Sequence, residues 1–151
     1  MFNRISVTRK QRDDRAVQLR IEPKAYEVPM SEIRRIASPD GRYELLLAST
    51  EMRMSHWVTS AALWEHASQR LLLQLGDGLW SSEEMDWSAD SRVVTVGLRR
   101  YPGDAPGIVL AVYLEQQIVI PRAPAETQPL AFAELNSFLE RYYTQHRRGR
   151  P

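Results

Sequence analysis

The sequence predicts a mainly β fold: an antiparallel sheet of about six to eight strands in two similar units, followed by one C-terminal amphipathic helix. Three observations predict this class. Short β-prone segments alternate with tight turns, the turn at residues 38–43 is repeated at residues 88–93, and apolar residues take helical spacing in residues 131–146. An α+β fold is the alternative.

The N-terminal part is expected to combine an arm with short strands. Residues 1–14 become wholly polar after Val7 and are expected to be a partly flexible arm, although Ile5 and Val7 could join a sheet edge. Residues 17–21 alternate apolar and polar side chains, which is typical of a half-buried strand. Residues 31–37 fit a strand and a helical turn equally well, and we take the strand.

The first unit opens with a tight turn. Pro39 fixes φ, Asp40 can bond its own backbone, and Gly41 tolerates positive φ. The strand that follows is mostly apolar, as expected for a strand covered on both faces. Three strands are predicted, at residues 43–48, 58–64 and 70–75.

The second unit repeats this order. Asp90-Ser91 takes the place of Asp40-Gly41, and strands are predicted at residues 93–98, 106–114 and 117–120. A turn followed by strands, with Leu63-Trp64-Glu65 closing the second strand, resembles one blade of WD-repeat and TolB-like β-propellers. Two blade-like units cover residues 33–121.

The resemblance implies a shape and no activity, because propeller families host many unrelated functions. Closed propellers need about 4–8 blades. Two units therefore imply an open or sandwich-like sheet, or a partial propeller completed by another copy or chain. Open sheet edges also predict a homodimer, paired edge to edge.

The C-terminal part leaves the sheet. Residues 121–129 hold three prolines and are predicted to link the sheet to a helix at residues 131–146, whose apolar stripe should pack on the sheet. Residues 147–151 are expected to be a disordered tail. With 151 residues the chain is expected to be a single domain.

Composition excludes several kinds of chemistry. The absence of cysteine excludes disulfides, thiol catalysis and thiolate metal sites. No signal peptide or membrane-spanning run is visible, so a cytoplasmic location is expected. Residues 1–24 and 141–151 each carry a net charge of +4, and residues 25–140 carry −7. No zinc-ligand spacing, nucleophile elbow or phosphate-binding loop is present, so no catalytic residue, metal site or cofactor is assigned.

Two stretches are candidate binding surfaces. Residues 76–90 are predicted to be a loop that carries carboxylates without a basic residue, and tryptophans in such a setting are frequent binding anchors. The predicted partner-binding residues are Asp77, Trp80, Glu83, Glu84, Asp86 and Trp87. A second surface is predicted at Glu51, Arg53, His56 and Trp57. Alternatively, the aromatic and methionine side chains of both stretches fill the core and the charged ones are solvated.

These observations favour a non-catalytic protein-recognition domain that binds a basic protein. Small size, an acidic body and missing catalytic chemistry are similar in kind to bacterial toxin-immunity proteins. One alternative is a small enzyme whose cleft joins Glu51, His56 and the acidic loop. The other is a nucleic-acid-binding protein that uses its two basic ends, although no recognition motif supports it.

Overall fold

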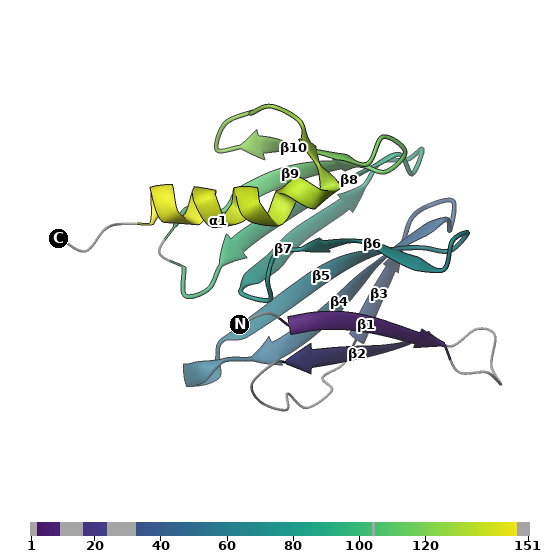
Figure 1. The fold of residues 1–151 in the computed structure, drawn as a ribbon, viewed down its shortest axis with the longest axis horizontal. Coiled ribbons are helices and arrows are strands. Elements are labelled where there is room, and N and C mark those ends of the chain that lie inside the picture. The colour runs from purple at the N-terminus through teal and green to yellow at the C-terminus, as the bar shows by residue number, and fades with distance from the viewer. Residues whose placement is uncertain (1–2, 10–16, 24–32, 104, 148–151) are drawn as a thin grey trace.

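The structure, a computed structural model, describes residues 3–9, 17–23, 33–103 and 105–147, with side chains from residue 33 onward. Within these ranges the chain forms eleven strands, one α-helix and two single turns of 3-10 helix (Figure 1). The first two strands, β1 (Asn3–Arg9) and β2 (Val17–Pro23), form an antiparallel pair.

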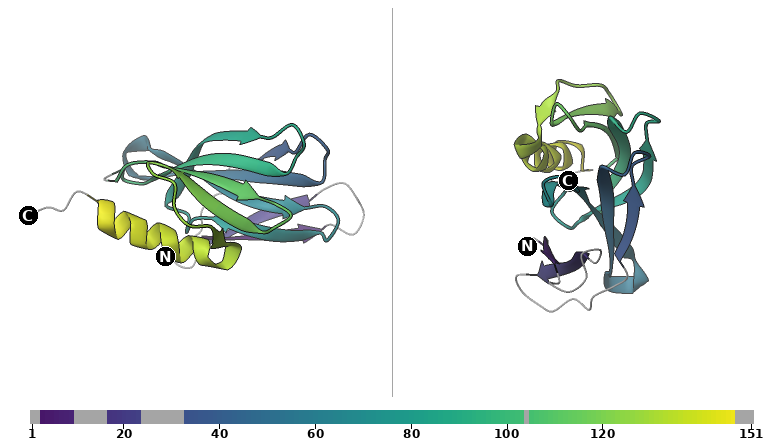
Figure 2. Two further views of the ribbon diagram at one scale, coloured as in Figure 1. Left: turned by 90° about the horizontal axis from the view of Figure 1, so that it is seen from above. Right: turned by 90° about the vertical axis from the view of Figure 1, so that its right-hand side faces the viewer.

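Two larger antiparallel sheets follow. The first has the strand order β3 (Ile33–Ala37), β4 (Tyr43–Glu51), β5 (Trp57–Glu65) and β6 (Arg70–Leu75). The second has the order β7 (Trp80–Trp87), β8 (Val93–Arg100), β9 (Ile108–Tyr113), β10 (Ile118–Ala123) and β11 (Leu130–Ala131). A 3-10 turn (Phe132–Glu134) then leads into α1 (Leu135–His146), which packs against the sheets (Figures 1 and 2). The predicted class, a mainly β antiparallel fold with a C-terminal helix, is confirmed.

The two repeated turns have the same hydrogen bonds. In the first, the Ser38 hydroxyl donates to the Asp40 carboxylate at 2.9 Å and accepts the backbone N–H of Tyr43 at 3.1 Å. In the second, the Ser88 hydroxyl donates to Asp90 at 2.6 Å and accepts the N–H of Val93 at 3.0 Å. The repeat in the sequence therefore corresponds to a repeated local structure at the start of β4 and of β8.

The two turns also contact each other. The backbone N–H of Asp40 donates to the hydroxyl of Ser91 at 3.0 Å. Ser91 is fully buried and has a φ of 60°, whereas Gly41 has a φ of 73° at the corresponding position. A serine at this left-handed position is less favourable than a glycine, but its hydroxyl joins the two sheets.

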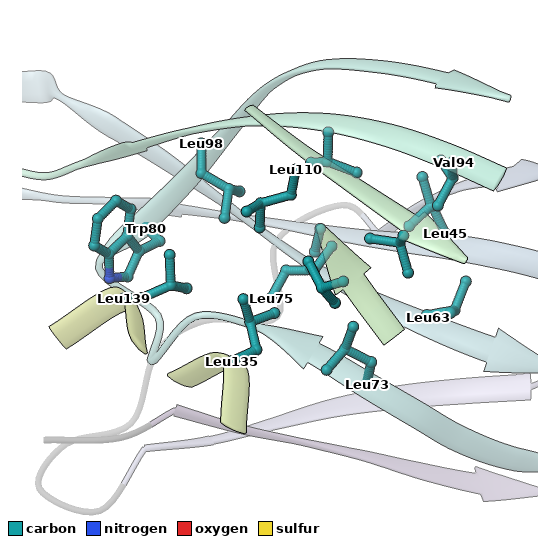
Figure 3. Close-up of a cluster of buried hydrophobic side chains, with 14 of the residues drawn as sticks. Leu45, Leu63, Leu73, Leu75, Trp80, Val94, Leu98, Leu110, Leu135 and Leu139 are labelled. Carbon is teal, nitrogen blue, oxygen red and sulfur yellow. The ribbon is translucent and has the colours of Figure 1, made fainter. Parts of the chain in front are cut away.

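One hydrophobic core is shared by both sheets and the helix. Side chains from β4, β5 and β6 face those from β8 and β9, with Leu135 and Leu139 of α1 closing the cluster (Figure 3). A smaller cluster of Leu46, Ala62 and Trp64 lies on the opposite face of β4 and β5. These central strands are therefore buried on both faces, as their continuous apolar sequence predicts.

Several predicted boundaries need correction. Residues 76–90 are not a loop, because β7 occupies most of them and pairs with β8. The proline-rich linker is shorter than predicted, because β10 extends to Ala123. Part of the predicted N-terminal arm is the strand β1, and residues 1–2, 10–14 and 148–151 lie outside the described residues.

The first turn predicts a dependence of stability on pH. A hydrogen bond from the backbone N–H of Arg42, together with the contacts of its guanidinium and of Ser38, lowers the pKa of Asp40 from 3.8 to about 2. Because the pKa of Asp40 is lower in the folded state than in the unfolded state, its carboxylate stabilises the fold at pH values above the unfolded-state pKa. This stabilisation is lost as the pH falls towards about 2. We expect Asp40→Asn to reduce the fall in melting temperature over this pH window, measured by circular dichroism. Asp86→Asn is the matched control, and an equal reduction in that variant would contradict the assignment.

Candidate functional site

Trp80, predicted to be an exposed anchor, is fully buried, so that prediction is wrong. Its ring centroid lies 6.4 Å from that of Tyr142 on α1, and the guanidinium carbon of Arg100 lies 5.9 Å from it. Figure 3 shows the indole close to Leu139. Trp80 faces the core because it begins β7 on the same side of the strand as the buried Ser82.

Asp77 and Trp87, two further predicted partner-binding residues, are also engaged within the domain. The Asp77 carboxylate accepts the backbone N–H of Leu79 at 3.0 Å and lies 3.9 Å from the guanidinium of Arg100. Trp87 is half-buried against the core, and its ring stacks on Tyr43 with centroids 6.5 Å apart. These two side chains hold the ends of β7 in place.

A bulge in β7 exposes the remaining acidic residues. Ser82 pairs with Leu98 and Glu84 with the next residue, Gly97, so Glu83 is an extra residue in the strand. The bulge leaves two consecutive exposed residues, Glu83 and Glu84, after the buried Ser82. The three predicted acids Glu83, Glu84 and Asp86 are all exposed.

A groove of about 180 Å³ lies where β5 begins, beside β7 and the turn after β8. It joins the two predicted surfaces, since His56 and Trp57 come from one and Glu83 from the other. The other lining residues include Ser81, Arg99, Arg100 and Tyr101. The Ser81 hydroxyl accepts the backbone N–H of Thr59 at 3.0 Å and so fixes β7 beside β5.

Charges at this groove are mixed. The guanidinium of Arg99 lies 3.3 Å from the carboxylate of Glu83 at the rim. Arg100 is directed towards the helix instead, where it donates to Glu140 at 2.7 Å and its guanidinium carbon lies 4.2 Å from the ring centroid of Tyr143. Both arginines are therefore engaged in ion pairs within the domain.

The hairpin between β4 and β5 presents the most exposed apolar side chains. Met54 is 89% exposed and Trp57 is 57% exposed. The hairpin is closed by a 2.6 Å hydrogen bond from the N–H of Met52 to the carbonyl of His56. Met54 and Ser55 both have a positive φ, of 63° and 58°, which is uncommon for residues other than glycine. We call Met54 and Trp57, with the residues between them, the hairpin tip.

The other residues of the second predicted surface lie on or next to this tip. Glu51, Arg53 and His56 are exposed. The ring of His56 lies 5.9 Å from that of Tyr101, whose hydroxyl donates to the carbonyl of Arg53 at 3.5 Å. Met54 was not among the predicted site residues, because a methionine between two strands fits a core position equally well.

The structure brings together only some of the residues of the alternative enzyme cleft. His56 and Glu83 line the groove, but Glu51 does not, and the Glu83 carboxylate lies against Arg99. Within the described ranges, no group of three or more His, Asp or Glu residues could hold a metal ion. The basic ends required for nucleic-acid binding lie largely outside the residues whose side chains are described.

Comparison of the chain with protein-family models, with curated proteins and with solved structures finds no match. No helix in the described part of the chain is long and apolar enough to cross a membrane.

Proposed function

We propose that this chain is a non-catalytic protein-recognition domain, and that it binds a basic partner through the hairpin tip and the acidic side of β7. The observation that carries the proposal is the exposure of Trp57 and Met54 beside a groove with a charged rim. Exposing large apolar side chains to water costs free energy. Aromatic residues at protein interfaces often dominate the binding energy. Trp57 takes the anchor role that the sequence assigned to Trp80.

The acidic residues of β7 supply the charge preference. Glu84 and Asp86 are exposed and have no ion-pair partner among the described residues, while Glu83 at the groove rim is paired with Arg99. We call Glu84 and Asp86 the acidic strip. Exposed carboxylates of this kind attract a basic surface and speed its association. An immunity-type role, in which a basic protein is neutralised by binding, is one form of this proposal.

The hairpin tip is tested by comparative capture from the native host. We expect immobilised wild-type protein to retain a specific partner that is lost with the double variant Met54→Ser, Trp57→Ala, because the anchor area is removed. Quantitative mass spectrometry of the two eluates is the measurement. Gln128→Ala, another exposed substitution, is the control and should retain the partner. An identical set of proteins on wild type and on the tip variant would reject the proposal.

The acidic strip predicts a kinetic effect on the captured partner. We expect Glu84→Lys with Asp86→Lys to slow association and to flatten its dependence on salt, because steering by exposed charges is screened over about 8 Å at physiological ionic strength. Trp57→Ala should instead speed dissociation. Surface plasmon resonance at several salt concentrations measures both rates. Unchanged association kinetics in the charge-reversed variant would remove β7 from the interface.

A further inference from the structure

A second concave site lies on another part of the molecule. A pocket of about 190 Å³ opens between α1 and the connection from β10 to β11. Figure 1 shows this connection looping beside the helix. The hairpin tip contributes no residue to it, so the protein-recognition proposal does not use it.

Aromatic rings and prolines form the wall of this pocket. Phe138, Tyr142 and His146 follow one another at four-residue spacing along α1, with successive ring centroids 6.4 Å and 4.2 Å apart. The Tyr142 hydroxyl is held by a 3.2 Å hydrogen bond to the carbonyl of Pro106, and Pro121 and Pro124 complete the apolar wall. Such a wall accommodates a flat apolar group.

The ionisable rim of the pocket is basic. Among the residues that the structure describes, Arg141 and His146 line it, and no Asp or Glu does. Two described acids nearby are paired elsewhere, since Glu140 accepts from Arg100 at 2.7 Å and Glu126 from Arg122 at 2.8 Å. Arg141 is exposed and has no ion-pair partner among the described residues. The Nδ1 atom of His146 donates a 2.9 Å hydrogen bond to the Tyr142 carbonyl, and this bond fixes the orientation of the imidazole ring.

We propose that this pocket binds a small aromatic carboxylate. The ring would lie in the pocket beside Phe138 and Tyr142, and the carboxylate would lie at Arg141, whose planar guanidinium matches it with two parallel hydrogen bonds. Size supports a single ring: an apolar cavity of about 150 Å³ takes up benzene, and this pocket is slightly larger. Drug-sized ligands need about 300 Å³ or more.

The test uses 3-phenylpropanoate as the probe and 3-phenylpropan-1-ol as the uncharged control, titrated into the full chain and followed by NMR. We expect the acid to shift the ring protons of Phe138 and Tyr142 and to bind about fivefold more tightly than the alcohol, the largest ratio expected from one exposed charge pair. Arg141→Gln should abolish this difference while leaving the weaker binding of the alcohol unchanged. Arg70→Gln, at another exposed arginine, should preserve it.

Three results would overturn the proposal. The first is no shift of the pocket rings at about 20 mM acid, where even a weak ligand of this size would bind. The second is equal affinity for the acid and the alcohol in the wild-type protein. The third is an acid preference that survives in Arg141→Gln. None of these readouts depends on a protein partner, so failure here is distinct from failure of the hairpin tip.

Discussion

Replacing Trp80 with alanine is expected to lower the free energy of unfolding by about 3–5 kcal/mol, the largest single effect predicted for this domain. Trp80 is fully buried where the start of β7 meets α1. Its removal would take away the contact with Tyr142 and leave a cavity against Leu139. The helix would then lose part of the surface on which it packs.

Urea unfolding followed by far-ultraviolet circular dichroism measures this loss. Trp57→Ala is the matched control, because it removes the same side chain from an exposed position and should change stability little. Trp80→Phe should cost less than Trp80→Ala, since the indole nitrogen has no hydrogen-bond partner in the described structure and a ring is retained. Equal stabilities for Trp80→Ala and Trp57→Ala would contradict the placement of Trp80 in the core.

The repeated turn was predictable because its information is local. Pro39, Asp40 and Gly41 each restrict or permit a backbone conformation within a few residues of themselves, and the hydrogen bonds of the turn span at most five residues. The helix was predictable for the same reason, because its apolar spacing is contained in its own sequence. What the local sequence could not show is that Ser91 bonds to the other turn.

The strand conformation of β7 and the burial of its side chains were not predictable from the local sequence. Its carboxylates and serines have little preference for strands, so the segment resembles a loop until β8 is available to pair with it. The bulge at Glu83 then breaks the two-residue alternation from which burial could be predicted. As a result, composition predicted the exposure of Glu83, Glu84 and Asp86 correctly, but it wrongly predicted that Trp80 is exposed as well.

A bulge in β6 affects the core as well. The sequence predicts that Leu45, Leu47, Leu72, Val94, Val96, Val109, Phe138 and Leu139 are buried together. Leu45, Leu47, Val94, Val96 and Leu139 are buried as expected, whereas Val109 and Phe138 are partly buried. Leu72, in contrast, is only partly buried, because β6 passes from Leu71 to Leu73 across a register shift opposite Leu63 and Trp64. Bulges depend on how two strands pair, so they require the tertiary structure.

The candidate surface was predicted in part. His56, Trp57 and Glu83 come from separate stretches of the chain, and the groove that joins them depends on β5 lying beside β7. The sequence could identify these residue types as suited to binding, but a single chain contains no local signal of their proximity. The positive φ of Met54 and Ser55 at this exposed turn had no local signal either, because neither residue is a glycine.

Gly76→Ala is expected to destabilise the domain by about 2–4 kcal/mol, through two additive causes. Gly76 has a φ of +98°, where a side chain is strained, and a Cβ atom there would lie 2.6 Å from the Cβ of Trp80. Both atoms are close to the backbone, so rotating a side chain cannot relieve the clash. The backbone N–H of Gly76 also donates to Asn136 on α1 at 3.0 Å, so any shift of this residue would disturb the helix.

Gly41→Ala separates the two causes. Gly41 also has a positive φ, of +73°, but a Cβ atom there would meet nothing within 4 Å. Its substitution should therefore cost only the conformational strain, about 1 kcal/mol. Urea unfolding of both variants gives the difference, which reports the steric clash at Trp80. If the two alanine variants were equally stable, the close approach of Gly76 to Trp80 would be disproved, and with it the reason why the chain enters β7 with this tryptophan facing inward.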